Sequence, residues 1–121
     1  MLTLFEEGGF PMWFLLAFSG LTLVTSARFA ARPDSSRLRL AAALGVATLF
    51  TTLTTISADL AQVGHHAPDY AARHPEQPFN TVIMQGIAES LSPAILGCTV
   101  LSLAALIVAL GIHREALSAK R

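Results

Sequence analysis

The chain has 121 residues, of which 53% are hydrophobic and only 13% are charged, and its formal net charge is +0. Because a soluble domain carries roughly 25% charged residues, this composition indicates an integral membrane protein. The sequence shows no glycine-rich phosphate loop and no basic patch, which excludes nucleotide-loop enzymes and nucleic-acid binding from the function classes considered.

Three charge-free stretches are long enough to cross a bilayer, at residues 11–27, 40–58 and 90–112. A hydrocarbon core of about 30 Å needs about 20 residues of helix. The sequence therefore predicts an all-α, multi-pass protein in which residues 1–121 form a single membrane domain. With no room for a soluble domain, the function has to be carried by three transmembrane helices, their connections and whatever they assemble with.

The first helix is predicted at about 11–31. Pro11 suits the first turn of a helix, and Pro33 and Asp34 end it. A cleaved signal peptide is the alternative, but such a segment begins with basic residues, whereas Glu6 and Glu7 precede this one. We therefore expect a retained helix, with a thin polar stripe formed by Ser19, Thr22 and Ser26.

The second helix is predicted at about 36–63, ending at Gly64, a common residue after a helix end. Its polar residues repeat at steps of four and three, which places them on one helix face. They are Thr48, Thr52, Thr55, Asp59 and Gln62. This ladder can serve an ion pathway, or its threonines can bond their own backbone and neighbouring helices.

An outer loop is predicted at 64–80, because it contains three prolines and no periodic apolar pattern. His65, His66 and His74, together with Asp69, are weak candidates for binding Zn²⁺ or Cu²⁺. Their spacing matches no compact motif, and a solvated, pH-responsive loop is the alternative. We therefore expect no metal and no cofactor.

The third helix is predicted at about 81–117, with Asn80 as its N-cap. Glu89 and Pro93 are four residues apart, so the proline removes the N–H that would bond the glutamate's own carbonyl. The pattern predicts a kink at Pro93 and a polar cluster of Glu89, Ser90 and Ser92, which Thr99 extends inward.

Ionisable residues at membrane depth cost about 2.5–3.5 kcal/mol at a helix centre and tend to mark ion pathways. Glu89 and Asp59 are candidates on this ground, and the alternative is that both are solvated at the outer interface. Cys98 is interpreted as a small packing residue.

Basic residues predict the orientation. The connection after the first span carries Arg28, Arg32, Arg37 and Arg39, and the C-terminal tail adds further basic residues. By the positive-inside rule both segments are cytoplasmic, so the N-terminus and the outer loop lie outside.

Two stretches give the sequence a family likeness. "GIAESLSPAILGCTVLSLAALIVALGI" resembles the third transmembrane helix of the MotA/TolQ/ExbB proton-channel family, and "LFEEGGFPMWFLLAFSGLTLVTSARF" is similar to that family's first helix. The predicted topology also agrees with that of the family. The likeness is to a reduced, three-helix member, since a short arginine-rich connection stands where the family has a large cytoplasmic insertion.

The resemblance implies a homo-oligomeric complex of the bacterial inner membrane that surrounds a single-span ExbD/TolR-like partner and couples proton movement to envelope work or transport. By position, Glu89 is the glutamate of the third helix, and the threonine face of the second helix lines the pore. Ala94 stands where the family has a threonine, for which Thr99 is a substitute.

Two other functions stay open. A structural or scaffold membrane protein would assemble through its polar helix faces without conducting ions, and small residues such as Gly86 and Gly97 would permit the close approach. A metal-handling or sensing protein would use the histidines of the outer loop. An enzyme is not expected, because the few polar residues supply no nucleophile with a base and an orienting group.

Overall fold

The computed structural model describes residues 9–121, which form four helices and no strand: α2 (Gly9–Ala31), α3 (Ser35–Arg73), α4 (Phe79–Ser90) and α5 (Ser92–Ala119). Three helical stretches are long and apolar enough to cross a membrane, namely Met12–Ala31, Ser35–Arg73 and Phe79–Ala119. The expectation of an all-α fold with three helices long and apolar enough to cross a membrane is therefore confirmed. Glu6 and Glu7 lie outside the described residues.

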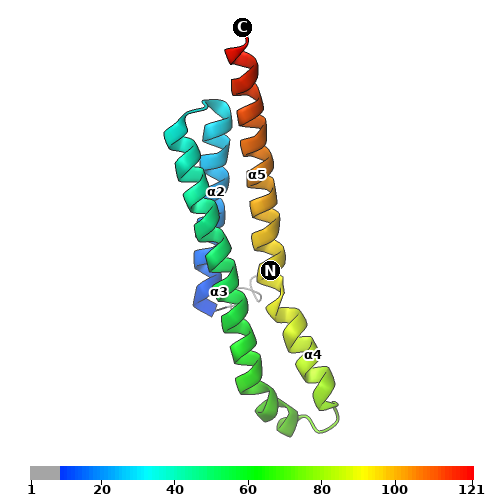
Figure 1. The fold of residues 1–121 in the computed structure, drawn as a ribbon. Coiled ribbons are helices and arrows are strands. Elements are labelled where there is room, and N and C mark those ends of the chain that lie inside the picture. The colour runs from blue at the N-terminus through cyan, green and yellow to red at the C-terminus, as the bar shows by residue number, and fades with distance from the viewer. Residues whose placement is uncertain (1–8) are drawn as a thin grey trace.

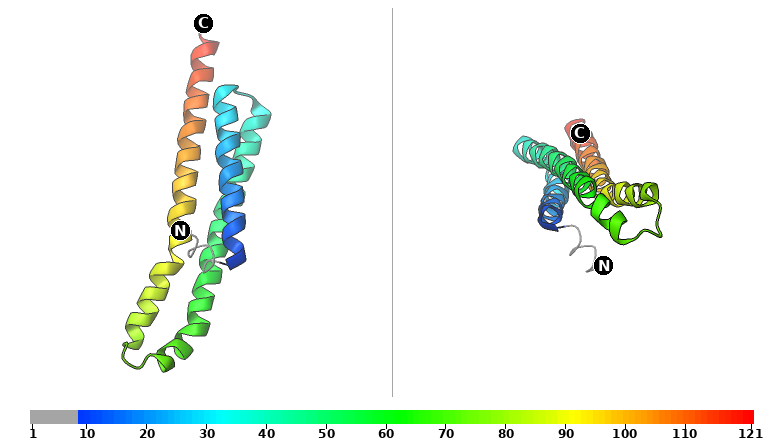
Figure 2. Two further views of the ribbon diagram at one scale, coloured as in Figure 1. Left: turned by 180° about the vertical axis from the view of Figure 1, so that it is seen from behind. Right: turned by 90° about the horizontal axis from the view of Figure 1, so that it is seen from below.

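The three long stretches lie side by side as an elongated bundle (Figure 1). A short connection joins α2 to α3, which returns antiparallel to it, and α5 packs against both. Among the described helices, α4 is the neighbour of the C-terminal part of α3 beyond the start of α2, so these two form a projecting helical hairpin (Figures 1 and 2). At the opposite end, the C-terminal turns of α5 extend beyond the α2–α3 connection (Figure 1).

Glycines mark where the helices come closest. A Cβ atom on Gly97 would meet the side chain of Thr52, and one on Gly86 would meet Val63 at 2.7 Å. Gly86 and Gly97 are eleven residues apart, and so are their partners Thr52 and Val63. The antiparallel register of α3 is therefore the same against α4 as against α5. In this register Asp59 of α3 lies level with Ser90, the residue that follows Glu89.

The second helix is longer than predicted. α3 passes through Gly64 and Pro68 and ends only at Arg73, so residues 74–78 connect it to α4 in place of the expected loop at 64–80. A glycine inside a helix costs only about 1 kcal/mol. Pro68 lacks the N–H that would bond the Gly64 carbonyl, but both residues are exposed, so that carbonyl can bond solvent.

The expected third helix at 81–117 is instead two helices. α4 begins at Phe79, and Pro78 occupies the N-cap position in place of the expected Asn80. The helix is interrupted at Leu91, whose N–H bonds the Ala88 carbonyl at 3.3 Å, and Leu91 in turn accepts the N–H of Ala94 at 3.0 Å. Pro93 thus lies in the first turn of α5, where its missing N–H leaves no hydrogen bond unmade.

Candidate functional site

A column of hydroxyl groups fills the centre of the bundle. Ser19, Thr22 and Ser26 of α2 face inward, and none of them is more than 4% exposed. Opposite them, Thr48, Thr52 and Thr55 of α3 are at most 2% exposed. The two polar stripes seen in the sequence therefore pack against each other inside one chain.

Most of these hydroxyl groups bond the backbone of their own helix. Thr48 donates to the Leu44 carbonyl at 2.9 Å, and Thr52 and Thr55 bond the carbonyls four residues before them in the same way. The Thr22 and Thr48 hydroxyls also bond each other across the helices at 2.8 Å. Within the described part of the chain, the Ser19 and Ser26 hydroxyls have no hydrogen-bond partner.

α5 completes this core with small residues. Gly97 lies against Thr52, and Gly111 lies against Phe29 and Ala30, where a Cβ atom would come within 3.0 Å. The backbone of α5 thus approaches both other helices closely. Thr48, Thr52 and Thr55, which the sequence analysis expected on a pore-lining face, are thus enclosed by the helices of their own chain.

The rest of the predicted ladder lies outside this core. Asp59 is partly exposed and Gln62 is exposed. In the register described above, Asp59 is level with the interruption between α4 and α5. The ladder therefore separates into a buried hydroxyl part and an accessible carboxylate end.

The polar cluster expected around Glu89 does not form. Glu89 is exposed and its carboxylate accepts a hydrogen bond from the Gln85 side-chain amide at 3.1 Å. Ser90 is buried on the other side of the helix, where its hydroxyl donates to the Gly86 carbonyl at 2.8 Å. Ser92 is exposed. Neighbouring residues of a helix point in different directions, and the interruption at Leu91 does not bring these side chains together.

A different polar stripe lies on the outer surface of α4 and α5. It consists of exposed residues at steps of three, four and seven: Gln85, Glu89, Ser92, Thr99 and Ser102. We call these five residues the outward polar stripe. Thr99 bonds the Ile95 carbonyl at 2.7 Å, so its hydroxyl oxygen still has a lone pair directed outward. Gln85 and Ser102 were missed from the sequence, although their helical spacing to Glu89 and Thr99 was readable there.

The histidines do not converge. His65 and His66 have their ring centroids 6.2 Å apart, whereas His74 stacks on Tyr70 at 4.5 Å and bonds Glu76 at 3.1 Å. Among the residues that the structure describes, no three histidine, cysteine or acidic side chains are grouped so that they could hold a metal ion. Cys98, expected to be a packing residue, is exposed.

Glu76 lies in the connection between α3 and α4, outside the long apolar helices. Its own backbone N–H and then the side chain of His74 hold the pKa of this carboxyl below its ordinary value. This pair shapes the connection and is remote from the outward polar stripe.

No family model, curated protein or solved structure matches this chain.

Proposed function

We propose that this chain is a subunit of a homo-oligomeric membrane complex that conducts protons, in the manner of MotA/TolQ/ExbB channel subunits. The observation that carries the proposal is the outward polar stripe, which places Glu89 and three hydroxyl groups on the surface of the helices that the sequence likeness singles out. In this proposal the stripe, and not the buried threonines, lines the ion path.

The surroundings of Glu89 support an assembly. Ile87, Leu91 and Ile95 are 37%, 47% and 71% exposed, so large apolar side chains surround the glutamate and the rest of the outward polar stripe. A carboxylate facing lipid is costly, and such residues face a protein interior or a water-filled cavity. Covering this surface with other subunits or with a partner helix provides that environment.

The proposed partners follow from the same surface. Copies of the chain pack side by side and leave a central space, in which a single-span ExbD/TolR-like helix is surrounded by Glu89 side chains. The complex resides in the bacterial inner membrane, with the N-terminus outside and the C-terminus in the cytoplasm. Ion movement through it is coupled to envelope work or transport.

Proton flux in proteoliposomes tests the proposal. The chain is reconstituted with each candidate single-span partner, and a pH-sensitive dye reports flux under an imposed potential. We expect flux with the unchanged chain and its loss with Glu89→Gln, which keeps the size and removes the charge. Glu115→Gln is the matched control, because Glu115 is exposed on α5 outside the charge-free stretch. A membrane that stays sealed with every partner would reject the proposal.

A structural membrane protein is the second candidate, and the buried hydroxyl core favours it. Paired hydroxyl stripes and close glycine contacts bind helices to one another without any ion. This candidate predicts that Glu89→Gln leaves the oligomer and the cellular function intact, and that replacing Gly86 or Gly97 by a bulky residue disrupts assembly by disturbing the packing of α3 against α4 and α5 within each subunit. Native mass measurements of the oligomer in detergent, combined with the flux assay, distinguish the two candidates.

A further inference from the structure

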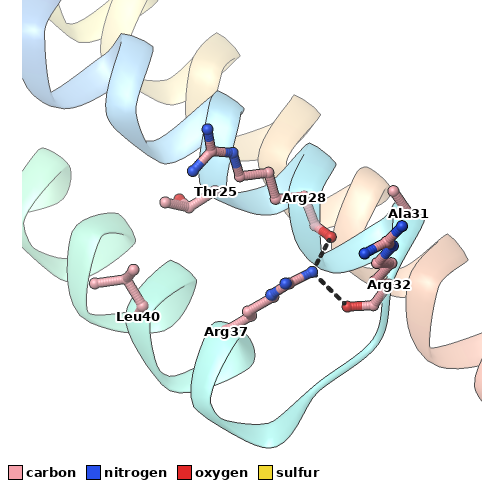
Figure 3. Close-up of a pocket in the computed structure, with 6 residues that line it drawn as sticks. All are labelled: Thr25, Arg28, Ala31, Arg32, Arg37 and Leu40. Atoms are coloured by element: carbon pink, nitrogen blue, oxygen red, sulfur yellow. Dashed lines mark hydrogen bonds between the residues drawn. The ribbon is translucent and has the colours of Figure 1, made fainter.

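A hollow of about 460 Å³ lies at the end of the bundle where α2 ends and α3 begins (Figure 3). Three of its six lining residues are arginines, and the full set is Thr25, Arg28, Ala31, Arg32, Arg37 and Leu40. Thr25, Ala31 and Leu40 supply its less polar wall. The hollow therefore combines a concentrated positive charge with an apolar side.

The described part of the chain supplies no counter-charge to this hollow. Within residues 9–121, no acidic side chain lies within 4.0 Å of the three arginines. The nearest acid in the sequence, Asp34, accepts a hydrogen bond from Ser36 at 3.0 Å instead. Arg28 and Arg32 are exposed, so their guanidinium groups are accessible to a ligand from solution or from a membrane surface.

Arg37 holds the hollow in shape. Its Nη1 donates to the Arg32 carbonyl at 3.3 Å and to the Arg28 carbonyl at 3.5 Å (Figure 3). The Arg28 carbonyl lies in the last turn of α2 and also accepts the backbone N–H of Arg32 at 3.1 Å, and Arg32 follows directly after the helix. A guanidinium group has five N–H donors, so N–H groups of Arg37 remain for another acceptor. The two hydrogen bonds therefore hold the Arg37 guanidinium group in place, and its other N–H groups stay available to a ligand.

The position of the hollow fits the boundary of a bilayer. Leu40 is the first residue of the charge-free stretch 40–58, and the arginines lie immediately beyond it. Acyl chains thus meet the apolar wall while the arginines lie at the depth of the lipid headgroups. Arginine binds phosphate through paired, charge-assisted hydrogen bonds, and basic pockets between transmembrane helices accept anionic headgroups.

We propose that this hollow binds the phosphate group of an anionic phospholipid. The three arginines contact the phosphate oxygens, and one acyl chain lies along Leu40 and Ala31. The ligand chemistry, a phosphate monoanion or dianion, is shared with soluble phosphate, but the apolar wall favours the lipid. The inference is independent of ion conduction, because the hollow lies at the opposite end of the bundle from Glu89.

Native mass spectrometry of the purified full chain in detergent tests this assignment. Phosphatidylglycerol and phosphatidylcholine are added separately, and the lipid retained per chain is measured. We expect preferential retention of phosphatidylglycerol, reduced about a hundredfold in the variant R28Q/R32Q, since each of the two lost charged hydrogen bonds contributes a factor of about ten. Arg37 is left unchanged because it bonds the end of α2.

Arg39→Gln is the matched control, since Arg39 is also exposed at this end but does not line the hollow. Equal loss of retention in this control, or equal retention of both lipids, would assign the effect to general surface charge and overturn the proposal. Inorganic phosphate is added in a separate arm. If it stabilises the chain against heat and phosphatidylglycerol adds nothing, the site belongs to soluble phosphate. Unchanged helicity of all variants by circular dichroism shows that they fold.

Discussion

Thr22 of α2 and Thr48 of α3 join their helices through hydroxyl groups 2.8 Å apart, at a point where neither side chain is more than 1% exposed. Each hydroxyl also lies within hydrogen-bond distance of a carbonyl of its own helix, at 2.7 Å for Phe18 and 2.9 Å for Leu44; because each hydroxyl has one proton, one donates across the helices while the other donates to its own carbonyl. The pair therefore links the two helices. If one hydroxyl is removed, the other can still donate to the carbonyl of its own helix.

Replacing either member of this pair by valine is expected to cost little. Hydrogen bonds between membrane helices average about 0.6 kcal/mol, so Thr22→Val and Thr48→Val should each lower the free energy of unfolding by about that amount. The double variant should cost less than the sum, because the shared bond is lost only once. Unfolding in mixed micelles measures the cycle. Thr54→Val, at an exposed threonine, is the control, and strictly additive losses would contradict the pairing.

Adding one methyl group at Gly97 is expected to be much more damaging. The new Cβ atom would lie 2.7 Å from Cγ2 of Thr52, a residue that is only 2% exposed. Overpacking of this kind costs about 1–3 kcal/mol. Gly20→Ala is the matched control, because nothing lies within 4 Å of a Cβ atom there, and it should be neutral or stabilising by up to about 1 kcal/mol. Similar unfolding midpoints for both variants would refute the close approach of α5 to α3.

Pro93→Ala tests the cause of the helix interruption. An alanine N–H at position 93 can bond the Glu89 carbonyl, so α4 and α5 should merge into a straighter helix. Spin labels at Asn80 and Leu110, both exposed, report this by electron-spin distance measurements. A straight helix separates them by about 45 Å, and the unchanged chain should give a shorter distance.

The same labelled pair in Ser92→Ala provides the control, in which the distance should not change. If Pro93→Ala also leaves the distance unchanged, the bend is held by packing of Gly86 on Val63 and not by the proline.

The contact between His74 and Glu76 predicts a titration of the α3–α4 connection. Because the pKa of Glu76 is lowered in the folded chain, its contribution to the connection is present above the ordinary glutamate pKa and is lost as the pH falls through the lowered value. The carboxyl carbon of Glu76 should therefore titrate at lower pH than that of an unfolded peptide. His74→Ala should move the midpoint only part of the way back, since the backbone N–H of Glu76 is the larger cause. A complete return would contradict this order of causes.

The membrane-spanning architecture could be read from the sequence, because charge-free stretches such as 40–58 follow directly from the cost of placing ions in hydrocarbon. The surroundings of the threonine face could not be predicted from the sequence. A polar stripe at helical spacing can face a pore, a neighbouring helix or solvent, and periodicity does not distinguish these. The matching stripe of Ser19, Thr22 and Ser26 was the available signal that both stripes would pack together.

The predicted helix boundaries were wrong where they were based on the preference of single residues for helix ends. Gly64 and Pro68 are common at helix ends, yet both lie inside α3 at exposed positions, where solvent can bond the Gly64 carbonyl that Pro68 leaves without its backbone donor. The direction of Glu89 also required the structure. Its spacing to Pro93 concerns the backbone carbonyl, whereas the side chain leaves the helix toward the outside and bonds Gln85.

The length of α3 sets how far the chain reaches from the bilayer. Asp59 is the first charged residue after the stretch 40–58, and fourteen further residues of unbroken helix follow it to Arg73. At 1.5 Å per residue this part of α3 extends about 21 Å. A protein bound to the connection at 74–78 would thus be held about that distance beyond the end of the charge-free stretch.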